Sequence, residues 1–241
     1  MNLIVDIGNT QTKVATFEEG EITWQKTYSS LTQFKNDVGQ LKIENSIVSS
    51  VSNMDLTNFV TDVLGKPLVL NSSTKLPIKN LYKTPSTLGN DRVANAVAAS
   101  RLFVKSNTLI VDTGTCLKFD FINNKNEYLG GAIAPGLRMR FQALNTFTAN
   151  LPFIEDFEKS ELIGNSTETS IVSGCLNGFL NEIEGTIRSY KHKLGNIKVV
   201  LTGGDSTMIE KMDFSQKNSI FADRWLTLKG LNEILKYNVE K

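Results

Sequence analysis

One segment of this chain occurs twice, and the repeat constrains the fold more than any other feature of the sequence. IVDIGNTQTKVATFEEGEI (residues 4–22) and IVDTGTCLKFDFINNKNEY (residues 110–128) both read as an apolar strand ending in aspartate, a glycine turn and a second strand. The alignment pairs Asp6 with Asp112, and each is followed two residues later by glycine. Such similarity is typical of a duplicated supersecondary unit. We therefore expect a bilobal protein whose two Asp-x-Gly turns point into one cleft.

The rest of the pattern predicts alternating strands and helices, which is typical of an α/β layer architecture. Each repeat is expected to open with an antiparallel three-stranded meander. The first half predicts strands at 2–7, 12–17, 21–28, 46–51 and 67–71, and helices near 31–40, 54–64 and 91–104. The second half predicts a meander over 108–134, helices from about 136, over 167–193 and near 229–238, and a strand at 197–205. We place the lobe boundary so that one lobe covers 1–106 and the other 107–241.

Composition excludes several classes of function. With 26 basic and 25 acidic side chains, the net charge of +1 argues against a nucleic-acid or anionic-membrane partner. The N-terminal stretch lacks the basic region of a signal peptide, and no apolar run approaches the roughly 18 residues of a membrane span. A cytoplasmic protein is therefore expected. Cys116 and Cys175 lie far apart without metal-ligand spacing, and the lone His192 lies in a basic stretch, which argues against disulfides, zinc and a Ser/His/Asp triad.

The first turn has the chemistry of a phosphate site. Glycine after a strand lets backbone N–H groups approach a ligand, and such groups attract phosphate oxygens. The residues Thr10, Gln11, Thr12 and Lys13 add hydroxyls, an amide and a cation. An aspartate there would repel phosphate unless a cation lay between them. We therefore interpret Asp6 as a ligand that binds Mg²⁺ through water.

The alternative is a simple hairpin turn at Gly8-Asn9 with Asp6 capping it. The second copy of the turn, and GGD at 203–205 after a third apolar strand, favour the functional interpretation. The chain contains no GxxxxGK[ST] P-loop and no GxGxxG after a strand.

These motifs carry a family resemblance. DIGNTxxK at Asp6–Lys13, DxGT at Asp112–Thr115 and GGD resemble the nucleotide-binding elements of the actin and sugar-kinase superfamily. YKTPSTLGNDR (82–92) is similar to the segment of type III pantothenate kinases that contains their GxDR motif, here Gly89–Arg92. Further matches are GGAIAPGL (130–137), NTFTANLP (145–152), GNSTETSIVSG (164–174) and LTLKGL (226–231), so the resemblance covers nearly the whole chain.

The resemblance implies an α/β fold of two duplicated actin-like (ribonuclease H-like) lobes with a nucleotide cleft between them. It implies ATP-dependent phosphorylation of pantothenate to 4'-phosphopantothenate, the first step of coenzyme A biosynthesis, with ATP and Mg²⁺. It also implies a homodimer whose substrate site lies near the interface. Two other readings are a non-catalytic regulatory or nucleotide-dependent assembly protein of the same fold, and a kinase for another hydroxylated acid. Retention of Asp91, Asp6 and Lys13 together argues against the non-catalytic reading.

The family's functional residues map onto this chain position by position. The matching catalytic base is Asp91; residue type alone would make it the N-cap of a helix that begins at about Arg92. Matches to nucleotide-binding positions are Asp6, Ile7, Gly8, Asn9, Thr10, Gln11, Thr12, Lys13 and Thr115. Matches to pantothenate-binding positions are Tyr82, Gly89, Asn90, Asp91, Arg92 and Thr167.

Three of these matches also have ordinary structural readings: Tyr82 as a packing aromatic, Arg92 as a surface helix residue, and Thr167 as a first-turn residue near an N-cap. The resemblance further implies that Asp112 binds a monovalent cation, potassium or ammonium. The chain departs from the family pattern at Cys116 and Lys118, where small or apolar residues are more usual. That departure leaves the identity of the cation open.

Overall fold

The computed structural model describes residues 1–8, 11–29, 31–50, 54–157, 160–212, 214 and 220–239. The chain forms two compact units. Unit 1 contains residues 1–105, 124–129 and 225–241, and unit 2 contains residues 106–123 and 130–224. The closing segment of the chain therefore packs with unit 1. The predicted lobe bounds, 1–106 and 107–241, stay a prediction.

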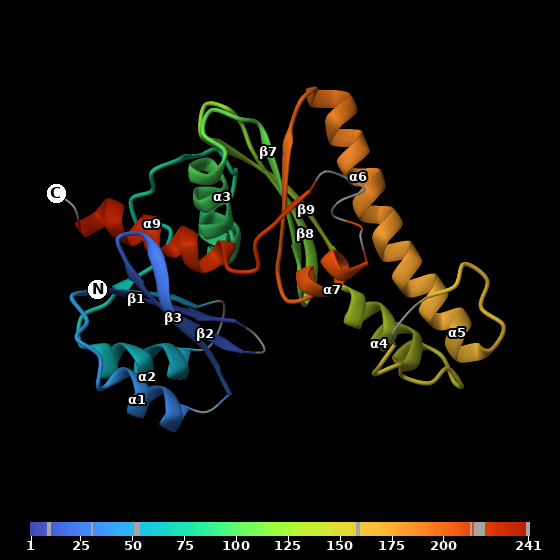
Figure 1. Cartoon of the computed structure of the whole chain (residues 1–241), viewed down its shortest axis with the longest axis horizontal. Coiled ribbons are helices and arrows are strands. Elements are labelled where there is room, and N and C mark those ends of the chain that lie inside the picture. The colour runs from blue at the N-terminus through green and yellow to red at the C-terminus, as the bar shows by residue number, and fades with distance from the viewer. Residues whose placement is uncertain are drawn as a thin grey trace. The chain divides into compact units, whose positions relative to one another are not determined.

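Unit 1 is built on a five-stranded sheet of order β3-β2-β1-β4-β5 (Figure 1). The first three strands form an antiparallel meander, which confirms the prediction for the first repeat. β4 lies parallel to β1 on its other side, and β5 continues parallel to β4. The strands are β1 (Asn2–Ile7), β2 (Thr12–Glu18), β3 (Glu21–Tyr28), β4 (Asn45–Ser50) and β5 (Leu68–Val69). The helices of unit 1 are α1 (Leu31–Val38), α2 (Met54–Leu64), α3 (Asn90–Leu102) and α9 (Leu226–Val239).

The two faces of β1 meet different helices because side chains alternate along a strand. Leu3, Val5 and Ile7 join one buried cluster with Phe34 of α1 and Val60 of α2. Figure 1 shows α1 and α2 on one side of this sheet and α9 on the other. Asp6 therefore belongs to the α9 face, the face from which the Asn2 amide donates a hydrogen bond to Asn232 Oδ1 of α9 at 3.2 Å.

Helix α3 is buried along most of its length, from Arg92 to Ser100, and it packs closely against α9. A Cβ atom on Gly230 of α9 would lie 1.8 Å from the carbonyl oxygen of Ala94 in α3. Only glycine fits at that point, since real Cβ atoms do not approach backbone so closely. The alanine-rich sequence of α3 suits the same purpose, because small side chains let two helix backbones come together.

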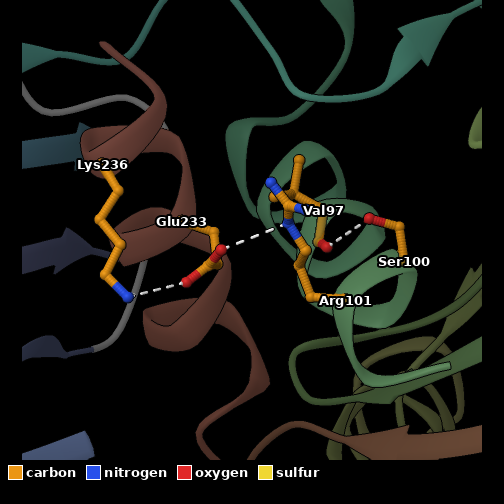
Figure 2. Close-up of polar contacts among 5 residues, drawn as sticks. All are labelled: Val97, Ser100, Arg101, Glu233 and Lys236. Carbon is orange, nitrogen blue, oxygen red and sulfur yellow. Dashed lines mark hydrogen bonds and ion pairs between the residues drawn. The ribbon is translucent and has the colours of Figure 1, made fainter. Parts of the chain in front are cut away.

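Polar contacts at the edge of this helix pair hold the two helices in register (Figure 2). Glu233 of α9 accepts from Arg101 of α3 at 3.3 Å and from Lys236 of its own helix at 3.2 Å. On α3, the Ser100 hydroxyl donates to the carbonyl of Val97 at 2.7 Å, so this buried hydroxyl is paired inside its own helix.

The second sheet has six strands in the order β11-β10-β7-β8-β9-β6. β7 and β8 are antiparallel, and β10 and β11 continue in parallel from β7, which confirms the predicted second meander and the strand before GGD. The strands are β6 (Lys79–Asn80), β7 (Thr108–Thr113), β8 (Cys116–Ile122), β9 (Glu127–Pro135), β10 (Lys198–Thr202) and β11 (Phe221–Ala222). The two residues of β6 pair with Glu127 and Tyr128, and all four belong to unit 1.

Helices α4 (Leu137–Phe147), α5 (Thr167–Val172), α6 (Gly178–Leu194) and α7 (Ser206–Lys211) belong to unit 2. The predicted helix over 167–193 is present, but a π-helical turn at Ser173–Asn177 separates α5 from α6. Two side chains of that turn bond outward, Ser173 to the carbonyl of Leu162 at 2.8 Å and Asn177 to that of Glu161 at 3.2 Å. These bonds tie the preceding loop to the widened turn.

Among the described residues, the sequence pattern missed four short elements: β6, β11, α7 and a 3-10 turn at Pro85–Thr87. Each is too short to show a hydrophobic period. No helix among the described residues is long and apolar enough to cross a membrane. Cys116 and Cys175 are free thiols, and His192 is exposed in the last turn of α6.

Candidate functional site

The first Asp-x-Gly turn closes the β1–β2 hairpin of unit 1. Asp6 stands opposite Lys13 of β2 in the antiparallel ladder, and opposite Ser49 of β4 in the parallel one. The Gly8 N–H donates to the carbonyl of Gln11 at 3.1 Å. Asn9 and Thr10, both predicted to bind nucleotide, lie outside the described residues.

Side chains around this turn divide between core and ligand-facing roles. Ile7 is 1% exposed and belongs to the apolar core, so only its backbone is suited to contact a nucleotide. Thr12 is also buried, whereas Gln11 is exposed and Lys13 is half-buried. The Ser49 hydroxyl is fully buried and has no hydrogen-bond partner among the described atoms. A buried hydroxyl without a partner is costly, and it is an observation that fits an oxygen-rich ligand beside Asp6.

The GNDR motif forms the start of α3. The N-cap of α3 is Gly89, so the interpretation of Asp91 as N-cap is wrong; Asp91 lies in the first helical turn. Its Oδ1 accepts a hydrogen bond from the Arg92 N–H at 2.9 Å. A Cβ atom on Gly89 would lie 2.5 Å from that same oxygen, so the glycine makes the room that the carboxylate occupies. Negative charge is also favoured there by the helix dipole.

Asn90 fastens this helix start to the sheet. Its amide nitrogen donates to the carbonyl of Ser50, the last residue of β4, at 3.3 Å and to that of Leu70, just after β5, at 3.1 Å. Because β4 is parallel to β1, the carboxyl ends of both strands lie at one edge of the sheet. The structure of unit 1 therefore brings Asp6 and Asp91 to the same edge.

Arg92 and Tyr82 form a third part of the candidate site in unit 1. Arg92 is only 5% exposed, so the reading as a surface helix residue is wrong. Its guanidinium carbon lies 5.6 Å from the ring centroid of Tyr82, and that ring lies 6.1 Å from the ring of Tyr128. These contacts confirm the interpretation of Tyr82 as a packing aromatic, and they also fix the position of the Arg92 guanidinium.

The second turn repeats the layout of the first. Asp112 at the end of β7 stands opposite Lys118 of β8 and opposite Thr202 of β10. The Thr202 hydroxyl is buried without a hydrogen-bond partner among the described atoms, as is that of Ser49 in unit 1. Each repeat thus places a lysine on one side of its aspartate and a buried hydroxyl on the other. In unit 2 the lysine is engaged, because Lys118 Nζ lies 2.8 Å from Asp112 Oδ2.

Close backbone contacts shape this second turn. A Cβ on Gly136, in the APGL segment, would lie 2.3 Å from the carbonyl oxygen of Gly114, and one on Gly203 would lie 2.3 Å from that of Thr113. Gly203 also has a φ of +96°, which favours glycine. The Asp205 N–H donates to the Thr113 carbonyl at 2.9 Å. The APGL and GGD turns are therefore packed on the DTGT turn, beside which Thr115 is exposed.

Asp205 is the main residue that the sequence assignment of site residues left out. Burial, and after it the nearby Asp112 charge, raise the pKa of its carboxyl to about 6, against the opposing effect of the Arg138 charge. The only sequence signal was its place as the last residue of GGD. Ser49 and Thr202 were also left out, since serine and threonine within apolar strands carry no distinguishing pattern.

Thr167 is exposed in the first turn of α5, whose N-cap is Ser166 in a capping box with Thr169. Its reading as a first-turn residue near the N-cap is therefore confirmed. A cavity of about 410 Å³ in unit 2 is lined by Phe153, Phe157, four carboxylate side chains and neighbouring residues of this region. None of the predicted site residues lines that cavity, and its negative charge does not suit an acid or a phosphate.

The site residues fit the two expected cations differently. The described residues contain no group of three His, Cys, Asp or Glu side chains placed to hold a metal. Mg²⁺ binds proteins through one or two carboxylates and takes water and phosphate oxygens for the rest, and Asp6 is the carboxylate that would hold it. A free monovalent cation fits poorly at Asp112, because the Lys118 ammonium already lies beside that carboxylate. Two positive unit charges about 4 Å apart repel by about 4 kcal/mol at an effective dielectric constant of about 20.

Known proteins resemble the chain over its whole length. A family model described as type III pantothenate kinase matches residues 2–189. A type III pantothenate kinase of Cytophaga hutchinsonii is 44% identical over 240 residues, which is 99% of this chain and 100% of the relative.

Solved structures show the same fold at low identity. A conserved Baf family protein from Campylobacter jejuni aligns over 99% of this chain and 100% of its own, with a TM-score of 0.66 and 20% identity. A ROK family glucokinase from Streptomyces griseus, solved with glucose and AMPPNP, aligns over 98% and 99% with a TM-score of 0.55 and 13% identity. These likenesses show a two-sheet α/β fold of the sugar-kinase kind.

Proposed function

The chain belongs to the type III pantothenate kinase family, and from that premise we propose that it transfers the γ-phosphoryl group of ATP to the primary hydroxyl of pantothenate. The product is 4'-phosphopantothenate, which commits pantothenate to coenzyme A synthesis. The observation that carries the proposal is the start of α3. There Gly89 leaves room for the Asp91 carboxylate, at the sheet edge that also holds Asp6.

Asp91 is the proposed catalytic base. Phosphoryl transfer requires positioning, neutralisation of charge and a group that takes the proton of the acceptor hydroxyl. The half-buried Asp91 carboxylate, held by the Arg92 N–H, supplies an acceptor in a defined position. Gly89, Asn90, Arg92, Tyr82 and Thr167 complete the proposed pantothenate site, with the Arg92 guanidinium available to the substrate carboxylate.

The first turn is the proposed phosphate site. The backbone from Asp6 to Gln11, with Thr12 and Lys13, would bind ATP phosphates, and Thr115 of the second turn would contact them as well. When bound, Mg²⁺ would neutralise phosphate charge, and Asp6 would hold it through water. In this division of work, residues 1–106 carry the first phosphate turn and GNDR, and residues 107–241 carry the DTGT and GGD turns.

A monovalent cation, K⁺ or NH4⁺, belongs to the family expectation at Asp112. The Lys118 ammonium stands at that carboxylate, so we derive no step through a bound potassium ion. A homodimer and a cytoplasmic location are further parts of the proposal. The exposed Leu162 and Ile163, shortly before Thr167, support a subunit contact near the substrate site.

The experiment is a direct assay of purified protein with ATP and Mg²⁺ against a panel of hydroxylated acids, with mass spectrometry of the products. We expect 4'-phosphopantothenate as the main product, formed from ATP in equal amount with ADP. If another acid is phosphorylated in preference to pantothenate, the proposed substrate is wrong and the proposed phosphoryl transfer stands. Nucleotide binding without any phosphorylated acceptor would favour the non-catalytic reading.

A further inference from the structure

Resting on the kinase activity proposed above, we propose that the Lys118 ammonium is a built-in monovalent cation of the second Asp-x-Gly turn. The enzyme would then work without added potassium or ammonium. The carboxylate that the family resemblance assigns to a free cation is Asp112, and Lys118 holds a positive charge against it in this chain.

The contact follows from strand register. Asp112 and Lys118 are direct partners across the antiparallel β7–β8 ladder, so their side chains project from the same face. The Nζ–Oδ2 distance is 2.8 Å, the usual length of a charge-assisted hydrogen bond. The Lys118 and Asp112 side chains are 15% and 10% exposed. Solvent therefore screens this pair far less than it screens a surface pair.

The second carboxylate oxygen of Asp112 faces the GGD turn. A Cβ on Gly203 would lie 2.6 Å from Oδ1, so the glycine backbone packs against that oxygen. One oxygen thus meets an ammonium group and the other meets backbone. A potassium ion that bound this carboxylate would need to displace Lys118 or to share the carboxylate with it against charge repulsion.

An ammonium group on a side chain is chemically equivalent to one of the two expected ions. Ammonium and potassium both carry one positive charge, and a lysine ammonium adds three N–H donors that can bond a carboxylate and phosphate oxygens. Tethering to β8 also gives the group a high effective concentration beside Asp112. Lys118 can therefore offset phosphate charge where a free ion would otherwise have to bind.

The repeat supports a role at the nucleotide. Lys13 has the same register relation to Asp6 in unit 1 that Lys118 has to Asp112 in unit 2. Each Asp-x-Gly turn therefore has a lysine opposite its aspartate, and the first of these is the proposed phosphate ligand. A lysine that served only the stability of the sheet would not need to lie opposite the aspartate of the turn.

The first test uses the wild-type protein. Initial rates of phosphopantothenate formation are measured with Tris salts of the substrates, as KCl or NH4Cl replaces choline chloride at constant ionic strength. Products are quantified by mass spectrometry, because coupling enzymes that need potassium would hide the result. We expect rates that change by less than about two-fold, as for a charge already in place. A steep rise with KCl or NH4Cl would overturn the inference and leave the kinase assignment intact.

The second test uses Lys118→Met, which keeps side-chain length and removes the charge. In choline we expect a rate lower by on the order of 10²-fold, and recovery of at least about ten-fold with KCl or NH4Cl, since an ion can now bind Asp112. Lys118→Arg keeps the charge and should stay indifferent to the salts. Lys26→Met removes a Lys–Asp pair of similar length, 2.6 Å to Asp37, and should retain wild-type rates and salt response.

Thermal unfolding gives a readout independent of activity. The Tm of Lys118→Met should be higher in KCl than in choline chloride, whereas wild type and Lys26→Met should show no such difference. An inactive wild type would contradict the proposed function, and the Tm comparison would still decide the role of Lys118. Loss of activity in Lys118→Met with neither rescue nor a potassium-dependent Tm would make Lys118 a structural residue. If Lys118→Met does not fold, the response of the wild-type rate to KCl and NH4Cl decides whether Lys118 replaces a free cation.

Discussion

At the scale of single residues, the position of Asp91 depends on the residue two places before it. The missing side chain of Gly89 leaves the space that Asp91 Oδ1 fills, and the Arg92 N–H holds that oxygen at 2.9 Å. The carboxylate is therefore oriented by its own helix turn. A group held in this way loses little conformational freedom when substrate binds, which suits a base that must accept a proton in one direction.

Asp91→Asn separates proton acceptance from structure. Asparagine can accept the same Arg92 N–H bond, so we expect a Tm lowered only by the lost helix-dipole interaction, about 0.3–1 kcal/mol, and a turnover lower by on the order of 10² to 10⁴. The KM for pantothenate should change little. Steady-state kinetics and a thermal melt measure both, with Asp62→Asn on the exposed side of α2 as the control. Turnover near that of wild type would remove Asp91 from the role of base.

Lys13→Ala tests the first turn as the phosphate site. A charge-assisted hydrogen bond contributes about 1.5–3 kcal/mol, so the KM for ATP should rise on the order of ten-fold to a hundred-fold. The KM for pantothenate should rise less. Lys35→Ala, at an exposed position of α1, is the matched control. A larger effect on pantothenate than on ATP would place the phosphates elsewhere.

Asp205 predicts a pH dependence of stability. Its folded-state pKa of about 6 lies above the ordinary value of 3.8, because of burial first and the Asp112 charge second. The folded protein therefore binds the proton more tightly than the unfolded chain. The stability that this group contributes is complete below about pH 4 and is lost as pH rises through about 6.

Asp205→Asn should accordingly raise the Tm at neutral pH and change it little at about pH 4. The full shift corresponds to at most about 3 kcal/mol, less the screening of a partly exposed group. The side chain makes no capping bond to α7, so the substitution breaks no cap. Thermal melts of both proteins across pH measure the difference. A constant difference in Tm at all pH values would contradict the shifted pKa.

At the scale of elements, the site depends on where α3 is fastened. Asn90 ties its start to the carboxyl ends of β4 and β5, and Gly230 allows α9 to pack against its middle. The Thr227 hydroxyl of α9 bonds the buried Asn95 side chain of α3 at 2.8 Å. Contacts along its length therefore determine the position of the helix that presents Asp91.

Gly230→Ala should separate α3 from α9. The added Cβ would overlap the Ala94 carbonyl, 1.8 Å away, and overpacking of this kind costs about 1–3 kcal/mol or more. We expect a lower Tm and a lower turnover, because α3 must shift. Gly185→Ala in α6 is the control, since its Cβ would meet no atom closer than the Arg188 guanidinium at 4.0 Å. An unchanged Tm for Gly230→Ala would mean that the two helices adjust without cost.

At the scale of the whole molecule, the expected dimer provides a test. Leu162 and Ile163 are 82% and 83% exposed, which is unusual for adjacent large apolar residues. Light scattering should give twice the chain mass of 26.7 kDa. The double substitution of Leu162 and Ile163 by serine should lower that mass and the turnover together. Val104→Ser, at an exposed position of unit 1, should change neither. A wild-type monomer with full activity would contradict the dimer proposal.

The sequence by itself determined the repeat, most helices and strands, and the family. These features are local: apolar periodicity reports burial of neighbouring residues, and motifs such as GNDR and DTGT are contiguous. Of the predicted site residues, Asp6 and the α3 start could be assigned to strand ends and a helix terminus from pattern alone. The N-cap assignment failed because the helix begins one residue before Asp91, and boundaries are the weakest part of any pattern.

Only the tertiary structure decided which segments meet. The bonds of Asn90 to two strand ends and the packing of α9 with unit 1 join residues far apart in the chain, and the burial of Arg92 against Tyr82 depends on how the segment between them turns back. The Lys118–Asp112 ion pair needs the register of β7 on β8, in which a shift of one residue would turn the lysine to the other face. Sequence pattern does not determine such a register, because it depends on the packing of the whole sheet.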